Sequence, residues 1–161
     1  MKLFTAPETV LFLDNDGPIL FLGGAIDKGK ASDWQQELIK KLSKQTCIIL
    51  NPRRKEWDPT WEQSIRNPQF VEQVNWELDG IELFADIVLI YLPAGTAAPI
   101  TLLEYGLSAK AKSATVVVYC PEGFYRKGNV DIVAQRNDIP VFEDQDLLVK
   151  HLIDLIKQFH E

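Results

Sequence analysis

The sequence predicts a protein of the α/β class, folded as a three-layer α/β/α sandwich around a mostly parallel, five-stranded sheet with one extra N-terminal strand. Two features of the chain predict this fold. Short apolar runs alternate with longer segments whose apolar residues recur at helical spacing, which is typical of parallel strands joined by helices. The run at 87–92 is apolar without interruption, as expected for a strand that helices cover on both faces.

Two strands are expected near the N-terminus, in the apolar runs at 9–13 and 19–22. Between them, Asp14-Asn15-Asp16-Gly17 is a sequence that favours a hairpin turn. The same four residues also resemble the first motif of the haloacid-dehalogenase phosphatases, in which the first aspartate attacks phosphate. Because the second apolar run begins at Ile19, the sequence leaves no room for the loop and helix of that site, and we expect the hairpin.

A helix is expected at 32–44, where the apolar residues recur at helical spacing and Ser32 can serve as the N-cap. A short buried strand follows at 47–50 and ends at Asn51-Pro52. The polar segment at 53–67 is too long for an ordinary connection, so we expect it to be functional or partly mobile.

The second half of the chain continues the alternation. Its helices are amphipathic, and the proline in its last short strand suits the edge of a sheet. The expected elements are, in order, a helix at 68–84, a strand at 86–92, a helix at 99–110, a strand at 115–120, a short helix within 121–137, an edge strand at 139–142 and a helix at 144–159.

Composition limits the classes of function. The chain has 161 residues, 46% of them apolar and 25% charged, which fits a single domain spanning 1–161. No apolar run approaches the ~20 residues of a membrane helix, no secretory signal is evident, and a cytoplasmic protein is expected. The net charge of -6 argues against nucleic acid as a partner. Cys47 and Cys120 are expected to be buried thiols, and no metal site or cofactor is expected because no His/Cys cluster has ligand spacing.

Glu104 is the main candidate for catalysis. It comes early in the helix expected to begin at Pro99, directly after the strand at 86–92. Open parallel sheets bind ligands at the carboxyl ends of their strands, and a carboxylate placed there can attack an electrophilic sugar carbon. The alternative is a capping role, since Thr101 and Glu104 have the spacing of a capping box and a glutamate near a helix start favours the helix dipole.

Three other groups of residues are candidates for ligand contact. Gly23-Gly24 ends the strand at 19–22 and lets a ligand approach the backbone, or it marks a tight turn; it lacks the third glycine of a dinucleotide fingerprint. Arg53 follows Asn51-Pro52 at a strand end and suits phosphate or carboxylate, or it lies in a solvated loop. Asp79 lies near a helix C-terminus, where its charge is disfavoured, so it either donates to a nucleobase or is a surface acid.

In this order, the motifs resemble those of the nucleoside 2-deoxyribosyltransferase family, and more closely its divergent second branch. The resemblance covers about Ile19 to Val133. It rests on Phe21-Leu22-Gly23-Gly24-Ala25, Asn51-Pro52-Arg53, Trp76-Glu77-Leu78-Asp79-Gly80-Ile81, Ala85-Asp86-Ile87-Val88, Leu103-Glu104-Tyr105-Gly106 and Gly128-Asn129-Val130-Asp131.

The resemblance implies a flavodoxin-like (Rossmann-like) fold and a double displacement. Glu104 is expected to attack the anomeric carbon of a 2-deoxynucleoside, and Asp79 matches the family acid that protonates the leaving base. Asn129 matches a sugar-binding position that a neighbouring subunit can supply, so a homo-oligomer, dimer or larger, is expected. The substrate-binding residues implied are Phe21, Gly23, Gly24, Asn51, Arg53, Asp86, Tyr105 and Asn129.

The sequence also departs from the classical family pattern. Phe21 stands where the classical enzymes carry a tyrosine, and Ala97-Ala98-Pro99 stands where they carry an aspartate; Tyr91 and Tyr105 are candidate substitutes.

Three functions stay open. The first is base exchange on a nucleoside with a free nucleobase as partner. The second is an N-glycosidase acting on 5′-monophosphates, with Arg53 or Arg54 near the phosphate. The third is a non-catalytic nucleotide-binding module.

Overall fold

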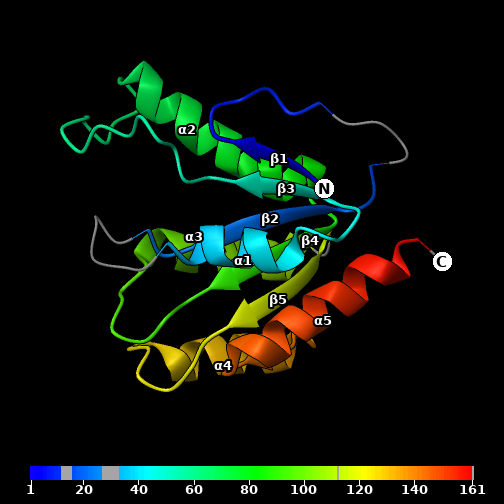
Figure 1. Cartoon of the computed structure of the whole chain (residues 1–161). Coiled ribbons are helices and arrows are strands. Elements are labelled where there is room, and N and C mark those ends of the chain that lie inside the picture. Colours follow the sequence, from blue (N-terminus) through cyan, green and yellow to red (C-terminus); the bar gives the residue numbers. More distant parts are fainter. Residues whose placement is uncertain (12–15, 27–32, 112, 161) are drawn as a thin grey trace.

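The protein is described by a computed structural model that covers residues 1–11, 16–26, 33–111 and 113–160. Its strands form one six-stranded sheet in the order β1-β3-β2-β4-β5-β6, and every pair of neighbours is parallel. Figure 1 shows the sheet running through the middle of the molecule. The strands are β1 (Lys2–Thr5), β2 (Ile19–Gly24), β3 (Ile48–Asn51), β4 (Ile87–Tyr91), β5 (Thr115–Tyr119) and β6 (Val141–Phe142).

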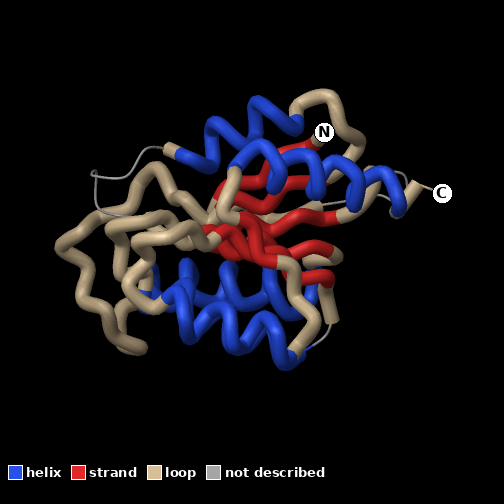
Figure 2. The backbone as a smooth tube through the Cα atoms, turned by 90° about the horizontal axis from the view of Figure 1, so that it is seen from below, coloured by secondary structure: helices blue, strands red, loops and turns tan. Residues whose placement is uncertain are grey.

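Helices cover both faces of this sheet, as Figure 2 shows. On one face, α1 (Trp34–Leu42) and α5 (Gln145–Gln158) pack on the side chains of β2, β3 and β4. On the other face lie α2 (Pro68–Asp79), a turn of π-helix η1 (Gly80–Phe84), α3 (Pro99–Ala111) and α4 (Lys127–Arg136). From β3 to β6 the strand order is that of the flavodoxin-like sheet, with β1 added beside β3. The predicted fold class is therefore confirmed.

Side-chain caps explain where the helices begin. The Asp33 carboxylate accepts a hydrogen bond from the backbone N–H of Gln36 at the start of α1. Asn67 caps α2 in the same way, and Pro68 follows it at the first helical position. Asp144 caps α5. The predicted cap Ser32 lies outside the described residues, and the cap that the structure shows is the next residue along the chain.

The N-terminal strand does not lie where the sequence predicted it. Strand β1 spans Lys2–Thr5, whereas residues 9–11 of the predicted strand form no strand and the remaining two lie outside the described residues. The predicted hairpin is wrong, because β2 has β3 on one side and β4 on the other, both parallel to it. Crossovers through α1 and α2 place β2 in the middle of the sheet, which leaves no free edge for an antiparallel partner.

The segment at 53–67 is packed against the N-terminal half of α2. Trp57 stacks edge-on against Trp61 at 5.2 Å between ring centroids and lies 6.4 Å from the ring of Phe70. The guanidinium of Arg54 lies 5.1 Å from the centre of the Trp61 ring. This aromatic cluster gives a loop with little regular structure its own set of contacts.

The carboxyl ends of the three central strands position the candidate site. Strand β2 ends at Gly24 beside Tyr91 of β4, and β3 ends at Asn51 on the other side of β2. Because the strands are parallel, the chain leaves all three at the same edge of the sheet, where open α/β proteins bind their ligands.

Candidate active site

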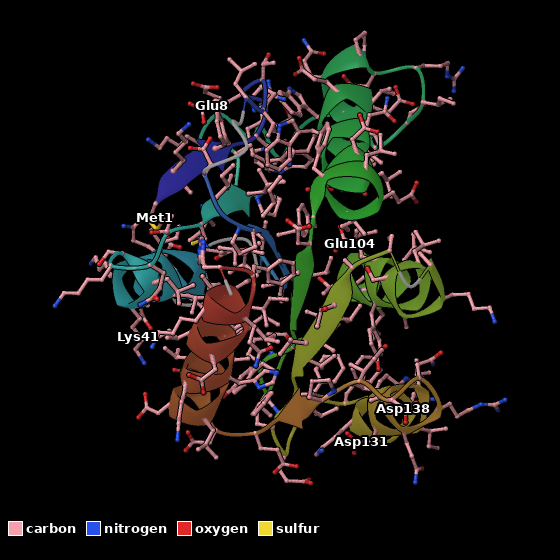
Figure 3. The ribbon with its side chains drawn as sticks, turned by 90° about the vertical axis from the view of Figure 1, so that its right-hand side faces the viewer. Met1, Glu8, Lys41, Glu104, Asp131 and Asp138 are labelled. Atoms are coloured by element: carbon pink, nitrogen blue, oxygen red, sulfur yellow. The ribbon has the colours of Figure 1, made fainter. Side chains whose placement is uncertain are left out.

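Glu104 lies on the inner side of α3, between this helix and the sheet. It is 7% exposed, in the second turn after Pro99, and the hydroxyl of Ser108 donates to its backbone carbonyl oxygen at 2.8 Å. Figure 3 shows Glu104 near the middle of the molecule. In the part of the chain that the structure describes, its carboxylate receives no hydrogen bond. A buried carboxylate without a donor is costly to ionise, which is unusual for a side chain with only a capping role.

A second carboxylate, that of Glu77 on α2, lies close enough for its charge to act on Glu104. Burial raises the pKa of Glu104 to about 8, and the charge of Glu77 adds to this increase. Burial also raises the pKa of Glu77 itself to about 7, against a hydrogen bond from Gln73 that lowers it. Two acids from different helices are therefore close enough to influence each other's ionisation.

The two carboxyl groups are best described as a coupled pair. Since burial raises the pKa of both groups and the charge of Glu77 disfavours a charge on Glu104, the pair can hold one proton near neutral pH. In that state one carboxyl group can donate a proton while the other acts as a nucleophile or base. Glycoside-cleaving enzymes use two carboxyl groups in these two roles.

Gln73 connects this pair to the end of strand β3. Its side-chain nitrogen donates to the backbone oxygen of Pro52 at 2.8 Å and to a carboxylate oxygen of Glu77 at 2.8 Å. Gln73 is 4% exposed, and its own side-chain oxygen is buried with no hydrogen-bond partner among the described residues.

Two arginines follow Pro52, and acidic side chains engage both. Arg53 lies 3.6 Å from the carboxylate of Asp33 and donates to the side-chain oxygen of Gln35 at 3.3 Å. Arg54 forms an ion pair with Glu72 at 2.8 Å. Asn51 is buried, and its side-chain oxygen accepts the backbone N–H of Arg53 at 3.0 Å, which fixes the turn out of β3. The predicted residues Asn51 and Arg53 thus lie at the same sheet edge as the carboxylate pair.

The two glycines at the end of β2 have close neighbours of their own. A Cβ at Gly24 would collide with the ring of Trp34 and lie 2.9 Å from the Tyr91 backbone oxygen, so the helix packs directly on this glycine. A Cβ at Gly23 would lie 3.1 Å from the Leu89 backbone oxygen, which is tight but not prohibitive. The absence of a side chain at Gly24 therefore serves packing, and ligand contact at either glycine stays a prediction.

Several predicted residues do not face the carboxylate pair. Phe21 is fully buried and packs 6.5 Å from the ring of Trp76. Tyr105 is 3% exposed, and its hydroxyl donates to the backbone oxygen of Val130. Asp86 lies at the amino end of β4, on the opposite edge of the sheet, where its carboxylate accepts the backbone N–H of Ile19 at 2.8 Å. A part in substrate binding does not fit the positions of these three residues. Asn129 is exposed on α4.

Asp79, the predicted acid, is exposed, whereas Glu77 two positions earlier is half-buried beside Glu104. Helical residues two positions apart point to nearly opposite sides, so the two acids cannot both face Glu104. Glu77 was not among the residues predicted from the sequence. A signal was present: Gln73 and Glu77 are polar residues on the same side of the helix as the apolar Val74 and Ile81, and a carboxylate on an inward face is unusual.

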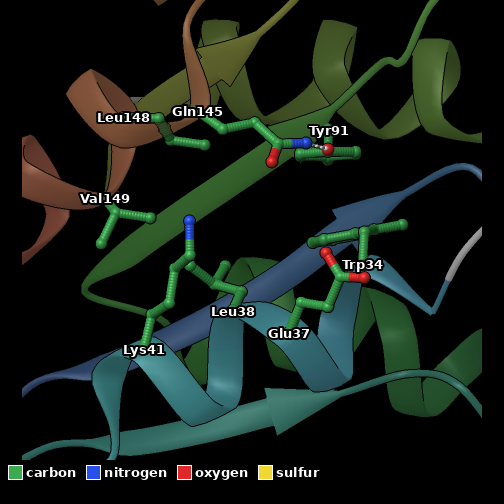
Figure 4. Close-up of a pocket in the computed structure, with 8 residues that line it drawn as sticks. All are labelled: Trp34, Glu37, Leu38, Lys41, Tyr91, Gln145, Leu148 and Val149. Atoms are coloured by element: carbon green, nitrogen blue, oxygen red, sulfur yellow. Dashed lines mark hydrogen bonds between the residues drawn. The ribbon is translucent and has the colours of Figure 1, made fainter.

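Two hollows on the molecule lie away from the carboxylate pair. One is between α1 and α5 and is drawn in Figure 4, where the Tyr91 hydroxyl accepts a hydrogen bond from Gln145 and lies beside Trp34. Another is an open groove between α4 and β6. Over the described ranges, no three His, Cys, Asp or Glu side chains form a group that could hold a metal ion. The same residues include no helix long and apolar enough to cross a membrane.

Comparisons with known families and with solved structures both gave matches. A family model described as nucleoside 2-deoxyribosyltransferase like matches residues 17–124. The crystal structure of a conserved protein from Enterococcus faecalis V583 is similar, with a TM-score of 0.59 and 12% identity over 88% of this chain and 98% of that chain. At that identity the similarity supports the fold alone. No curated protein matches the chain. Because the family match spans well over half of the 161 residues and includes both acids of the pair, the chain belongs to the nucleoside 2-deoxyribosyltransferase-like family.

Proposed function

We propose that this protein is an enzyme that cleaves the N-glycosidic bond of a nucleoside or deoxynucleoside and transfers the sugar to another base through a covalent glycosyl-Glu104 intermediate. The observation that supports this most directly is the pair formed by buried Glu104 and half-buried Glu77 near the carboxyl edge of the sheet. Membership of the family supports the same class of substrate. A structural role explains neither a buried carboxylate that receives no hydrogen bond from the described residues nor its placement near a second carboxylate.

The reaction needs one proton, which the pair holds. In the first step the Glu104 carboxylate bonds to the anomeric carbon, the C–N bond breaks, and Glu77 gives its proton to the departing base. In the second step the Glu77 carboxylate takes a proton from the acceptor base, whose nitrogen attacks the anomeric carbon, and the bond to Glu104 breaks. The pair ends with the proton and charge that it began with, and the sugar keeps its configuration after two displacements.

In this proposal Glu77 replaces Asp79 as the acid. Glu77 is half-buried, influences the pKa of Glu104 and has a raised pKa of its own, as expected for a group that gives up a proton near neutral pH. Asp79 is exposed on the other side of α2. Asn51, Arg53 and Gly23 remain proposed substrate contacts because they lie at the same sheet edge.

Hydrolysis of nucleoside 5′-monophosphates is the alternative activity, and Arg54 is the observation that favours it. The Arg54 side chain is 11% exposed, and its Nε is buried without a hydrogen-bond partner in the described ranges, so it has a donor to offer. Its ion pair with Glu72, like that of Arg53 with Asp33, means that a phosphate would compete with a carboxylate already in place.

The test is incubation with a panel of nucleosides, deoxynucleosides and their monophosphates, each with and without free bases, followed by chromatography of the bases. Base exchange supports transfer, and release of base without an acceptor supports hydrolysis. Glu104→Gln keeps the shape and removes the nucleophile, so turnover should fall ~10³-fold or more. Binding without turnover, with the same affinity in Glu104→Ala, would instead support a nucleotide-binding module.

We also propose that the protein forms a homo-oligomer, a dimer or larger. Ile100, Leu103 and Leu107 make a stripe on the outer side of α3, away from the sheet, and are 62%, 61% and 39% exposed. Gly106 lies within this stripe with open space above it, which lets another helix approach closely. The stripe suits the α3 helix of a second copy of the chain. If the two helices pack antiparallel around a twofold axis, the start of the stripe on one helix meets the end of the stripe on the other.

A further inference from the structure

The amide of Gln73 has only one orientation that fits its surroundings. One of its two end groups faces the backbone oxygen of Pro52, which can only accept a hydrogen bond. The group at that position must therefore be the NH₂. Its second hydrogen points to the Glu77 carboxylate, with 2.8 Å between the amide nitrogen and the carboxylate oxygen. In the reverse orientation three acceptor oxygens would face one another without a proton between them. Pro52 thus fixes Gln73 as a donor toward Glu77.

A donor fixed in this way treats the two acids of the pair differently. A hydrogen bond from an N–H favours the ionised form of the carboxylate that accepts it. Glu77 receives such a bond, and Glu104 receives none from the described residues. Burial is the main influence on the pKa of each acid, and it raises both.

We infer that Gln73 is a positioning residue that holds the negative charge on Glu77 and leaves the shared proton on Glu104 while the site is empty. This inference rests on the proposed function for its catalytic meaning, because Glu104 then becomes a nucleophile only after its proton moves to Glu77 or to the bound base. It also gives Gln73 a part in the covalent intermediate. There Glu104 is an uncharged ester, Glu77 has lost its proton to the departing base, and the Gln73 amide stabilises the remaining charge.

The other charged groups around the pair do not account for this difference. In the segment after β3, Arg53 is engaged by Asp33 of α1 and Arg54 by Glu72 of α2. On η1 and the end of α2, Glu82 and Asp79 are exposed. On the α4 side, Lys127 binds Asp131 and Glu143, and the Tyr105 hydroxyl of α3 binds a backbone oxygen. The side chains that β2 and β4 direct to this face of the sheet, among them Phe21, Val88 and Ile90, are apolar.

The test measures where the proton resides, by NMR of ¹³C-labelled glutamate side chains across a pH titration of the full-length protein. Glu77→Gln and Glu104→Gln assign the two signals. In the wild type, Glu77 should lose its proton at a lower pH than Glu104. In Gln73→Met, which is similar in size but has no donor, the Glu77 midpoint should rise by about one pH unit, a tenfold gain in proton affinity, and the order should reverse.

Gln69→Met is the matched control, because Gln69 lies one turn earlier on the same helix and is exposed. It should leave both midpoints unchanged. If Gln73→Met does not fold, Gln73→Asn keeps an amide that is one methylene too short to reach both acceptors and should move the Glu77 midpoint in the same direction. An unchanged Glu77 midpoint in a folded Gln73 variant, or a wild type in which Glu104 ionises first, would overturn the inference.

The titration separates this inference from the proposed function, since it needs no turnover. If the protein turns over no nucleoside but the midpoints move as expected, Gln73 positions the proton and the proposed activity is wrong. If turnover occurs, Gln73→Met should move the alkaline limb of the kcat/KM profile to higher pH, because Glu77 without its donor keeps its proton to a higher pH. An alkaline limb at the same pH as in the wild type would contradict the inference.

Discussion

Charge on Glu77 raises the pKa of Glu104, although the two residues belong to different helices and are separated in the chain by the whole of strand β4. This relationship organises the candidate site. It supports Glu77 as the proposed acid, it lets one proton serve both steps of the proposed reaction, and it leads to effects of pH and of single substitutions that can be measured.

The first prediction separates the two candidates for the acid. Glu77→Gln should lower kcat/KM by about 100-fold or more, because the departing base then receives no proton from the protein. Asp79→Asn should stay within about threefold of the wild type, since that side chain is exposed. Steady-state kinetics with a nucleoside found active in the panel provides the measurement. The opposite ranking would restore Asp79 as the acid.

The second prediction concerns the pH dependence of kcat/KM, which should be bell-shaped. Below the lower pKa, about 7, both acids hold protons and no nucleophile is present; above the higher one, about 8, both are ionised and no acid is present. The activity should therefore be highest between these values. With Glu77→Gln the alkaline limb should disappear and the acidic limb should move to lower pH, because the charge that opposed ionisation of Glu104 is gone. A profile that is flat from about pH 6 to 9 would contradict the coupled pair.

The third prediction concerns stability. Both acids ionise near 4.5 in an ordinary environment but at about 7 and about 8 in the folded protein, so the folded state holds more protons between these values. Stability from these groups is complete below about pH 4.5 and is lost as the pH rises toward 8. Glu104→Gln removes the part of this loss that ionisation of Glu104 causes. Its free energy of unfolding should exceed that of the wild type by about 2 kcal/mol at about pH 9, with a Tm higher by about 4–8 °C.

The same comparison contains its own control. At about pH 5 both glutamates are protonated in the folded protein, so the difference between Glu104→Gln and the wild type should become small. Glu122→Gln, a substitution of an exposed glutamate, should show little difference at either pH. Equal stability of Glu104→Gln and the wild type at alkaline pH would mean that Glu104 ionises without cost, and the burial argument would fail.

The fourth prediction concerns the homo-oligomer. Leu103→Lys places a charge in the middle of the exposed stripe on α3 and should convert the oligomer to monomers, as measured by light scattering after size exclusion. Leu147→Lys is the control, because Leu147 is 59% exposed, nearly the same as Leu103 at 61%, but lies on α5 across the sheet. A wild-type monomer at all protein concentrations, or equal effects of the two substitutions, would exclude this interface.

Local patterns in the sequence were sufficient for most of the fold. Continuous apolar runs predicted β4 and β5, and amphipathic spacing predicted α5 and one helix over the residues that form α2 and the π-helical turn η1. The prediction failed at the N-terminus, where the apolar run at 9–13 suggested a hairpin. A hairpin and an edge strand have similar local sequences, and only the occupation of both sides of β2 by parallel neighbours excludes the hairpin.

The sequence by itself determined the alternation of strands and helices and the position of Glu104 just after a central strand, because these follow from spacing along the chain. The tertiary structure decided which residues accompany Glu104: it placed Glu77 beside it, Asp79 in solvent and Asp86 at the opposite edge. The reason is physical. A carboxylate acquires its chemistry from burial, neighbouring charge and hydrogen bonds, and these come from segments that meet only when α2 and α3 pack on the same face of the sheet.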